Sequence, residues 1–170
     1  DVNGLTIKNM TARNYATNGF FVRDSAPDGQ LSNGKIDCND YVFKNLIASF
    51  TRSSGFYAFG CAGGKMLKSE GFGHGDSAYY VGATPPQGNP KTTVLKGLEA
   101  YENVLGDPGT NSRYVKLTNG NWYNNGAGIV PNFAGVLLVT NLAAGTFAVM
   151  LAFIEFRGES AVYRVLMVAG

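Results

Sequence analysis

The sequence has 170 residues, of which 45% are hydrophobic and 15% charged, and its 14 basic and 12 acidic side chains leave a formal charge of +2. This length fits one domain, which we expect to span residues 1–170, and the 23 glycines disfavour long helices. The near-neutral balance contains no block of lysines or arginines, so nucleic-acid binding is not expected.

Short similar phrases recur along the chain at intervals of a few tens of residues. The first kind is found at Ile7–Met10, Phe43–Leu46, Leu67–Ser69, Leu95–Leu98, Leu117–Gly120 and Val139–Leu142. A second kind, rich in glycine and aromatic residues, is found at Gly19–Val22, Gly55–Phe59, Ala78–Val81 and Gly126–Val130. Each period therefore holds two short strands.

These strands are too short to bury their own apolar faces, which indicates a solenoid in which neighbouring coils complete the core. Alternation, as in Leu5-Thr6-Ile7-Lys8, places apolar side chains inward and polar ones outward. We expect the third position of the first phrase to form a stacked ladder of turn residues along the axis. Its members would be Asn9, Asn45, Asn119 and Asn141, interrupted by Ser69 and Gly97.

The phrases resemble the right-handed parallel β-helix repeat proteins of the pectate-lyase-like superfamily. The resemblance covers most of residues 2–132, and its most specific stretches are Gly73–Gly82, Glu99–Asn103, Gly109–Asn111 and Asn124–Asn132. It implies an all-β, right-handed parallel β-helix of about six coils. It also implies an extracellular or surface protein that acts on, or adheres to, carbohydrate polymers. The chain departs from the pattern after Gly82, where Ala83–Pro90 contains no cysteine.

The start of the chain and its two cysteines both bear on the cellular compartment. Asp1 opens the chain without the basic and apolar succession of a signal peptide, so we expect a processed or truncated start. Cys38 and Cys61 are separated by about one period and should lie on adjacent coils. Whether they form a disulfide or two buried thiols stays open, and a zinc site with His74 is disfavoured.

The repeats are clear over residues 1–132, whereas residues 133–170 form an apolar end. No charged residue lies between Leu117 and Ile154, so the segment 133–154 is long enough to span a bilayer. Asn141 nevertheless continues the repeat, and we expect β coils or a cap whose apolar side chains extend the core. A membrane helix and an altered end are the alternatives. The open apolar edge would suit a cap or a second copy of the chain.

Polar residues of consecutive coils are predicted to meet in one outer groove. The candidate catalytic residues are Arg52, His74, Asp76 and Glu102. For an elimination reaction, His74 would be the base and Arg52 would neutralise a uronate carboxylate. Asp76 would orient His74, or would bind calcium together with Glu102 and Asp107. For hydrolysis, Asp76 and Glu102 would form the carboxyl pair.

Aromatic and amide side chains are expected to line this groove. Tyr79, Tyr80 and Tyr101 would offer flat faces to sugar rings. Asn103 and Asn124 would bind hydroxyl groups, whereas Phe20, Phe56 and Phe59 are predicted core residues.

The leading hypothesis is a secreted or cell-surface protein that acts on a polysaccharide as a lyase, epimerase or hydrolase. The alternative is a non-catalytic glycan-binding, structural or adhesion solenoid. Calcium is the one cofactor that the predicted carboxylates would suit, a membrane partner is not favoured, and the identity of the polymer stays open.

Overall fold

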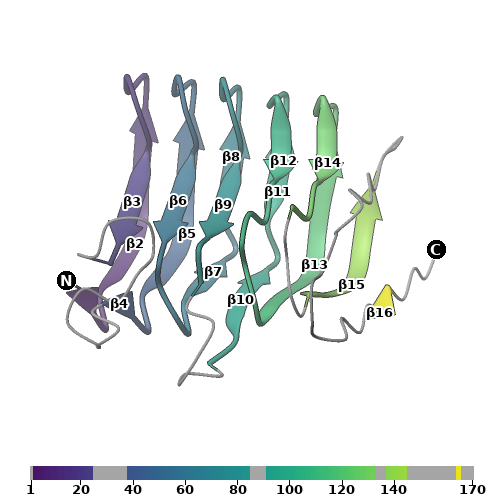
Figure 1. The fold of residues 1–170 in the computed structure, drawn as a ribbon. Helices are drawn as coiled ribbons and strands as arrows, with labels where there is room; N and C mark the ends of the chain where they lie inside the picture. The colour runs from purple at the N-terminus through teal and green to yellow at the C-terminus, as the bar shows by residue number, and fades with distance from the viewer. Residues whose placement is uncertain (1, 25–37, 85–90, 133–136, 145–163, 166–170) are drawn as a thin grey trace.

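The computed structural model describes residues 2–24, 38–84, 91–132, 137–144 and 164–165. In this part of the chain all regular structure is β, and every pair of neighbouring strands is parallel. The coils follow one another in chain order from β2 to β15 (Figure 1). The predicted right-handed parallel β-helix is confirmed.

Most strands belong to one long parallel sheet. Its members are β2 (Thr6–Arg13), β5 (Val42–Ser49), β7 (Lys65–Leu67), β8 (Glu70–Phe72), β10 (Thr93–Lys96), β11 (Glu99–Tyr101), β13 (Val115–Tyr123), β15 (Leu137–Ala144) and β16 (Arg164–Val165). In the third and fourth coils it is interrupted between β7 and β8 and between β10 and β11. Each coil bends at this point, and the line of bends divides the long sheet into two halves.

Shorter sheets close the coil on its other sides. The β3-β6-β9 sheet contains β3 (Phe20–Arg23), β6 (Phe56–Phe59) and β9 (Tyr79–Gly82). Two-stranded sheets pair β12 (Leu105–Asp107) with β14 (Ala127–Ile129), and β1 (Val2–Asn3) with β4 (Cys38–Asn39). Isolated parallel bridges pair Ser77 with Leu105 and Gly82 with Thr110. They connect the β3-β6-β9 side of the solenoid to the later coils.

The coils bend where single residues adopt the left-handed backbone conformation. Every described residue with positive φ falls into one of four columns that the strand register aligns from coil to coil. The columns are Gly4, Asp40, Gly63 and Tyr114; Asn9, Asn45, Lys68, Gly97 and Asn119; Asn14, Phe50, Gly73, Glu102 and Asn124; and Gly60, Ala83 and Asn111. Glycine and asparagine are frequent there because they tolerate this conformation best.

The predicted asparagine ladder is present at its first rungs. The side-chain amide of Asn45 donates a hydrogen bond to Oδ1 of Asn9 at 3.2 Å. In the third coil the prediction is wrong by one residue. Ser69 was expected at the ladder position, but Lys68 occupies the bend. Ser69 instead lies beside Leu46 and accepts a hydrogen bond from its backbone N–H at 3.1 Å.

The core is built from inward columns of aromatic and aliphatic side chains. Phe20, Phe56 and Tyr79 stack along the axis with ring centroids 5.2 and 4.8 Å apart, and all three are buried. The prediction is therefore confirmed for Phe20 and Phe56. It is wrong for Phe59, which alternates to the outer side of β6 and lines a surface depression.

Cys38 and Cys61 lie on adjacent coils and form a disulfide, with their Cα atoms 4.6 Å apart. The predicted adjacency is confirmed, and the bond decides between the two alternatives that the spacing left open. Both cysteines are buried in the core.

The apolar C-terminal segment is described only in part. β15 pairs with β13 so that Thr140 lies beside Thr118, which places Asn141 next to Asn119 in the bend column. The prediction of β structure is thus confirmed for residues 137–144. The rest of 133–154, and the predicted contact of the apolar end with a second copy, lie outside the described residues. Among the described residues, no helix is long and apolar enough to cross a membrane.

The left-handed bend gives a test of the ladder. Asn45 has a φ of 53°, so Asn45→Ala should lower the free energy of unfolding by about 1–2 kcal/mol through backbone strain. Asn45→Gly also removes the hydrogen bond to Asn9 but relieves the strain, and it should therefore be the less damaging change. Urea denaturation of both variants measures the difference. Equal losses would contradict the role of the left-handed bend.

Candidate functional site

An aromatic column lies on the outer face of the β3-β6-β9 sheet. Phe21, Tyr57 and Tyr80 occupy equivalent positions on the three strands. The rings stack nearly parallel, with centroids 5.3 Å apart between Phe21 and Tyr57 and 4.5 Å apart between Tyr57 and Tyr80. Phe21 is 48% exposed. We call these three residues the aromatic column.

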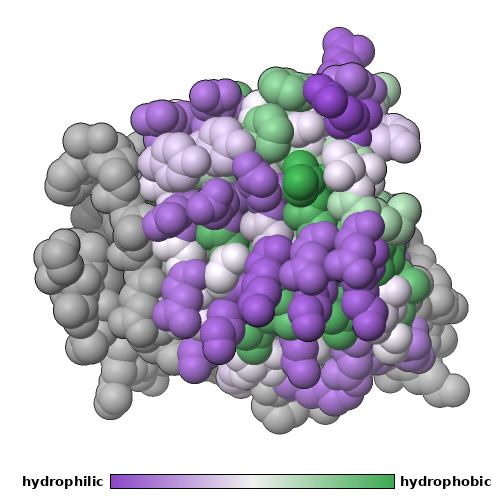
Figure 2. Space-filling model, turned by 180° about the vertical axis from the view of Figure 1, so that it is seen from behind, coloured by the Kyte–Doolittle hydropathy of each residue, from purple (hydrophilic) through white to green (hydrophobic). Residues whose placement is uncertain are grey.

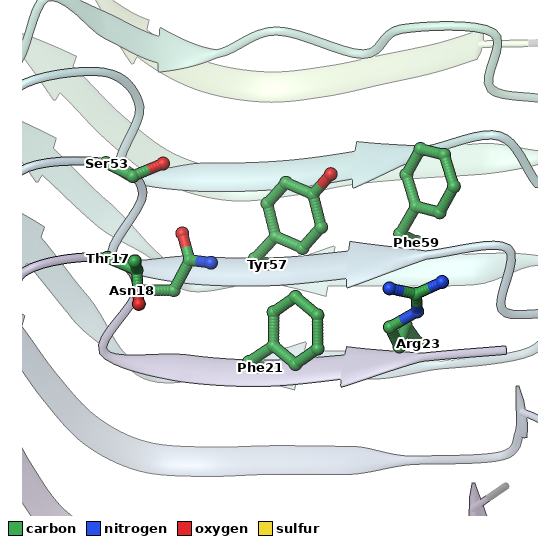
Figure 3. Close-up of a pocket in the computed structure, with 7 residues that line it drawn as sticks. All are labelled: Thr17, Asn18, Phe21, Arg23, Ser53, Tyr57 and Phe59. Carbon is green, nitrogen blue, oxygen red and sulfur yellow. The ribbon is translucent and has the colours of Figure 1, made fainter. Parts of the chain in front are cut away.

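An open depression of about 350 Å³ adjoins the column. Figure 3 shows Phe21 and Tyr57 one above the other on neighbouring strands, with Arg23 and Phe59 at one end and polar side chains at the other. The lining residues are Thr17, Asn18, Phe21, Arg23, Ser53, Tyr57 and Phe59. The surface thus combines flat apolar rings with hydrogen-bonding groups at its edge, which suits sugar rings and their hydroxyls.

Alternation along each strand explains why these rings face outward. Phe20, Phe56 and Tyr79 point into the core, so the next residue on each strand points to solvent. Burial and the neighbouring Tyr80 raise the pKa of Tyr57, whose hydroxyl therefore stays protonated at neutral pH. The charges of Arg23 and Asp76 act on the pKa of this hydroxyl in opposite directions, Arg23 lowering it and Asp76 raising it.

A second set of stacked rings lies on the long sheet, beyond its bend. Phe72, Tyr101 and Tyr123 are in register, with ring centroids 4.9 and 5.0 Å apart. The Tyr101 hydroxyl donates a hydrogen bond to Oε1 of Glu70. Glu99 lies beside Glu70 on the adjacent strand. This cluster places a phenol and two carboxylates on one outer surface.

His74 lies in the interior and not in an outer groove. Its side chain is only 3% exposed, and burial lowers its pKa to about 4. Nδ1 accepts a hydrogen bond from the backbone N–H of Thr51 at 3.3 Å and contacts the Thr51 hydroxyl at 2.7 Å. Nε2 makes no hydrogen bond of good geometry to any residue that the structure describes, although the nearby Ala48 carbonyl opposes part of the pKa shift. The predicted outer position of His74 is wrong.

The neighbours of His74 continue a buried polar ladder through the same turn. The Asn103 side-chain oxygen accepts a hydrogen bond from the His74 backbone N–H at 3.0 Å. The Asn103 amide group donates to Oδ1 of Asn125 at 2.9 Å. Asn103 is buried, so its predicted contact with substrate is wrong. These side chains pair the backbone groups of a tight turn, as buried polar atoms require.

The other predicted catalytic residues stand near this turn but face different surroundings. Arg52 and Glu102 are exposed, and Glu102 occupies a left-handed bend position. Asp76 is half-buried and accepts a hydrogen bond from the Ser54 hydroxyl at 3.3 Å. The structure thus brings these residues to one turn of consecutive coils, but the base of the proposed set, His74, is turned away from solvent.

Two further predictions fail because the side chains point inward. Tyr79 is fully buried, and its hydroxyl donates to the backbone carbonyl oxygen of Ser69 at 2.6 Å, so it cannot stack on a sugar. Asp107 is also buried, and no set of three potential metal ligands forms among the described residues. The predicted calcium set of Asp76, Glu102 and Asp107 is therefore wrong. Tyr80, Tyr101 and Asn124 do lie at the surface.

Comparison with known proteins is consistent with the fold. No family model and no curated protein matches the sequence. Among solved structures, the chain is similar to the A-module of a mannuronan C-5 epimerase from Azotobacter vinelandii, a parallel β-helix protein, with a TM-score of 0.66 at 20% identity. The match covers 82% of this chain and 35% of that one. The chain thus spans about a third of the length of that structure, and the likeness concerns the fold.

Two buried titratable groups predict an unusual pH dependence of stability. The pKa of His74 is lowered from 6.5 to about 4, so between these values the unfolded chain holds a proton that the folded chain rejects, and stability rises with pH. Burial raises the pKa of Asp107 from 3.8 to about 7, so the folded chain keeps a proton that the unfolded chain loses, and stability falls with pH. The two contributions should largely offset each other.

We therefore expect the urea midpoint of the wild type to change little between pH 4.5 and 6.5. Asp107→Asn removes the contribution of Asp107 and retains that of His74, so the urea midpoint of this variant should rise with pH over this window. His74→Asn retains only the contribution of Asp107, so the urea midpoint of this variant should fall as the pH rises. Parallel profiles for the wild type and both variants would contradict the assignment.

Proposed function

We propose that this chain recognises a polysaccharide through the aromatic column on the β3-β6-β9 sheet. The observation that supports the proposal most directly is the nearly parallel stacking of the Phe21, Tyr57 and Tyr80 rings on an open surface. Three rings on consecutive coils form an aromatic strip along the axis, and a linear glycan that follows the axis can contact one ring on each coil. Arg23, which lines the adjoining depression, would bind hydroxyl or acidic groups, and the Asp76 carboxylate would accept hydrogen bonds from sugar hydroxyls.

The name of the structural neighbour describes an enzyme that acts on mannuronan, a polysaccharide. That likeness supports carbohydrate polymers as the class of ligand, and it is compatible with membership of the pectate-lyase-like superfamily. The Cys38–Cys61 disulfide supports a secreted or cell-surface location, because such bonds persist in oxidising compartments.

Binding is tested by affinity electrophoresis in gels that contain polymannuronate, polygalacturonate, xylan or dextran. Tyr57→Ala should weaken retention in the best ligand by about tenfold, since it removes the central ring of the column. Tyr57→Phe keeps the ring and should bind nearly as the wild type does. Tyr15→Ala, which removes a 55% exposed tyrosine outside the column, is the matched control. Equal retention of Tyr57→Ala and wild type would exclude the column as the binding surface.

A second candidate function is catalysis at the Glu70–Tyr101 pair. Lyase, epimerase and hydrolase reactions all need a group that transfers a proton at the sugar. Burial and the hydrogen bond to Glu70 raise the pKa of Tyr101, so the phenol is protonated at neutral pH and can pass its proton only to a strong base, such as the alkoxide oxygen of a leaving sugar. Glu70 and Glu99 on adjacent strands supply carboxylates on the same surface.

Activity is tested by incubating the protein with acidic polysaccharides, with and without calcium, and by following unsaturated products by absorbance and chain shortening or epimerisation by NMR. Tyr101→Phe preserves the stacking with Phe72 and Tyr123 and removes the proton. It should lower turnover by ~10²-fold or more, the usual scale for losing a general acid. Tyr123→Phe should be nearly normal. If the wild type converts no polymer, the catalytic candidate fails while the binding proposal stands.

A further inference from the structure

A face rich in lysine covers the first half of the long sheet, on the N-terminal side of its bend. Lys8, Lys44 and Lys96 belong to one outward column, in which Leu67 fills the position of the third coil. Lys65 and Lys116 belong to the next outward column, two residues earlier on each strand. We call Lys8, Lys44, Lys65, Lys96 and Lys116 the lysine face.

Each of the five consecutive strands β2, β5, β7, β10 and β13 contributes one lysine to this face. Neighbouring strands are ~4.8 Å apart, so the positive charges advance along the solenoid axis by about this interval, although from β5 onward they alternate between the two columns. Lys68, in the bend beside the face, adds a further charge. Figure 2 shows hydrophilic side chains gathered in a band across consecutive coils.

Acidic side chains are absent from the outward positions of these strand halves in the described part of the chain. The other outward residues there are Thr6, Val42, Leu67, Val94 and Thr118. The single ion pair between described residues joins Lys91 to Asp40, outside the face. The glutamates Glu70 and Glu99 lie beyond the bend, on the second half of the sheet. Charge is thus segregated, and the lysines are not neutralised by their neighbours.

We propose that the lysine face is a second binding surface, separate from the aromatic column, that holds a linear polyanionic glycan along the solenoid axis. One cation per coil matches a polymer that carries one acidic group per repeating unit. Nucleic acid fits less well, because duplex DNA carries one charge per ~1.7 Å and stacked aromatic residues are absent from the outward positions of the face.

A membrane surface also fits less well than a glycan. The large hydrophobic residues that are well exposed in the described part of the chain are Met10, Tyr15, Phe21, Ile47, Phe50 and Val104. None of them stands at an outward position of the lysine face, and the apolar residues there, Val42, Leu67 and Val94, are half-buried, so this face offers little apolar surface for insertion. With two separate surfaces, one molecule can hold two glycan strands and cross-link them.

The test uses polygalacturonate and its fully methyl-esterified form, which has the same backbone without the charge. Binding of the intact chain is measured by biolayer interferometry at 50 and 300 mM NaCl. The wild type should bind the acidic polymer at low salt, lose most of that binding at high salt, and bind the ester only through the aromatic column. Lys65→Gln with Lys96→Gln should weaken binding to the acidic polymer ~30-fold, from about fivefold per lysine.

Arg13→Gln with Lys91→Gln removes the same charge outside the face and is the matched control, expected to bind within about twofold of the wild type. Tyr57→Ala separates the two proposals, since it should leave the salt-sensitive component unchanged. Equal weakening by both double variants would overturn the lysine face as a site. Tighter binding to phosphatidylglycerol vesicles or to duplex DNA than to polygalacturonate at the same salt would overturn the glycan as its ligand.

Discussion

The recurrence of left-handed backbone at the same four points of successive coils is the constraint on which this structure depends. The left-handed conformation costs a residue other than glycine about 1–2 kcal/mol. This conformation therefore persists only where stacked coils fix the chain on both sides. Backbone N–H groups at the bends donate hydrogen bonds to carbonyl oxygens of the next coil, as from Phe50 N–H to the carbonyl of Phe72 and from Gly73 N–H to that of Tyr101. A coil that slipped by one residue would move its bends out of all four columns together. Register is therefore determined along the whole solenoid, and with it the direction of every outward side chain.

This dependence on register explains what could be predicted from the sequence. Asn9 and Asn45 were recognisable because asparagine is one of the few residues suited to the bend. Cys38 and Cys61 were placed on adjacent coils because one period separates them. The third coil was misread because Lys68 was matched to Lys44, whereas Leu67 is the residue that pairs with Lys44. A shift of one position exchanges the inner and outer faces of a strand, so such an error propagates to every residue of its coil.

The predicted site failed for a different reason, which is the need to pair buried backbone groups. His74 was predicted to be a catalytic group, and Asn103 a substrate-binding group, of an outer groove because an imidazole can transfer protons and an amide can bind hydroxyls. A tight turn between stacked sheets leaves backbone N–H groups without strand partners, and the same side chains can accept their hydrogen bonds. His74 accepts from Thr51, and Asn103 accepts from His74. Sequence pattern alone cannot separate the two uses, because both require polar residues at a turn.

The surfaces that carry the two proposals were invisible in the linear sequence for a related reason. Tyr57 and Tyr80 are 23 residues apart, and neither stands out beside the inward Phe56 and Tyr79 that precede them. The lysines form no block in the sequence, yet the fold sets one of them on each of five consecutive coils. Composition therefore excluded a basic segment correctly but could not exclude a basic face.

A solenoid turns such repetition into a particular kind of binding surface. Each coil adds one ring to the aromatic column or one charge to the lysine face, so affinity grows with the number of coils that a polymer spans. Loss of one contact should therefore lower the affinity by the share of that contact. In a single enclosed pocket, loss of the central anchor residue would remove most of the affinity. The depression beside Tyr57 is open and shallow, which fits a ligand that is held along its length. A long polymer with a repeating chemical unit is the ligand whose own periodicity can use every coil, and this is why both proposals name a polysaccharide.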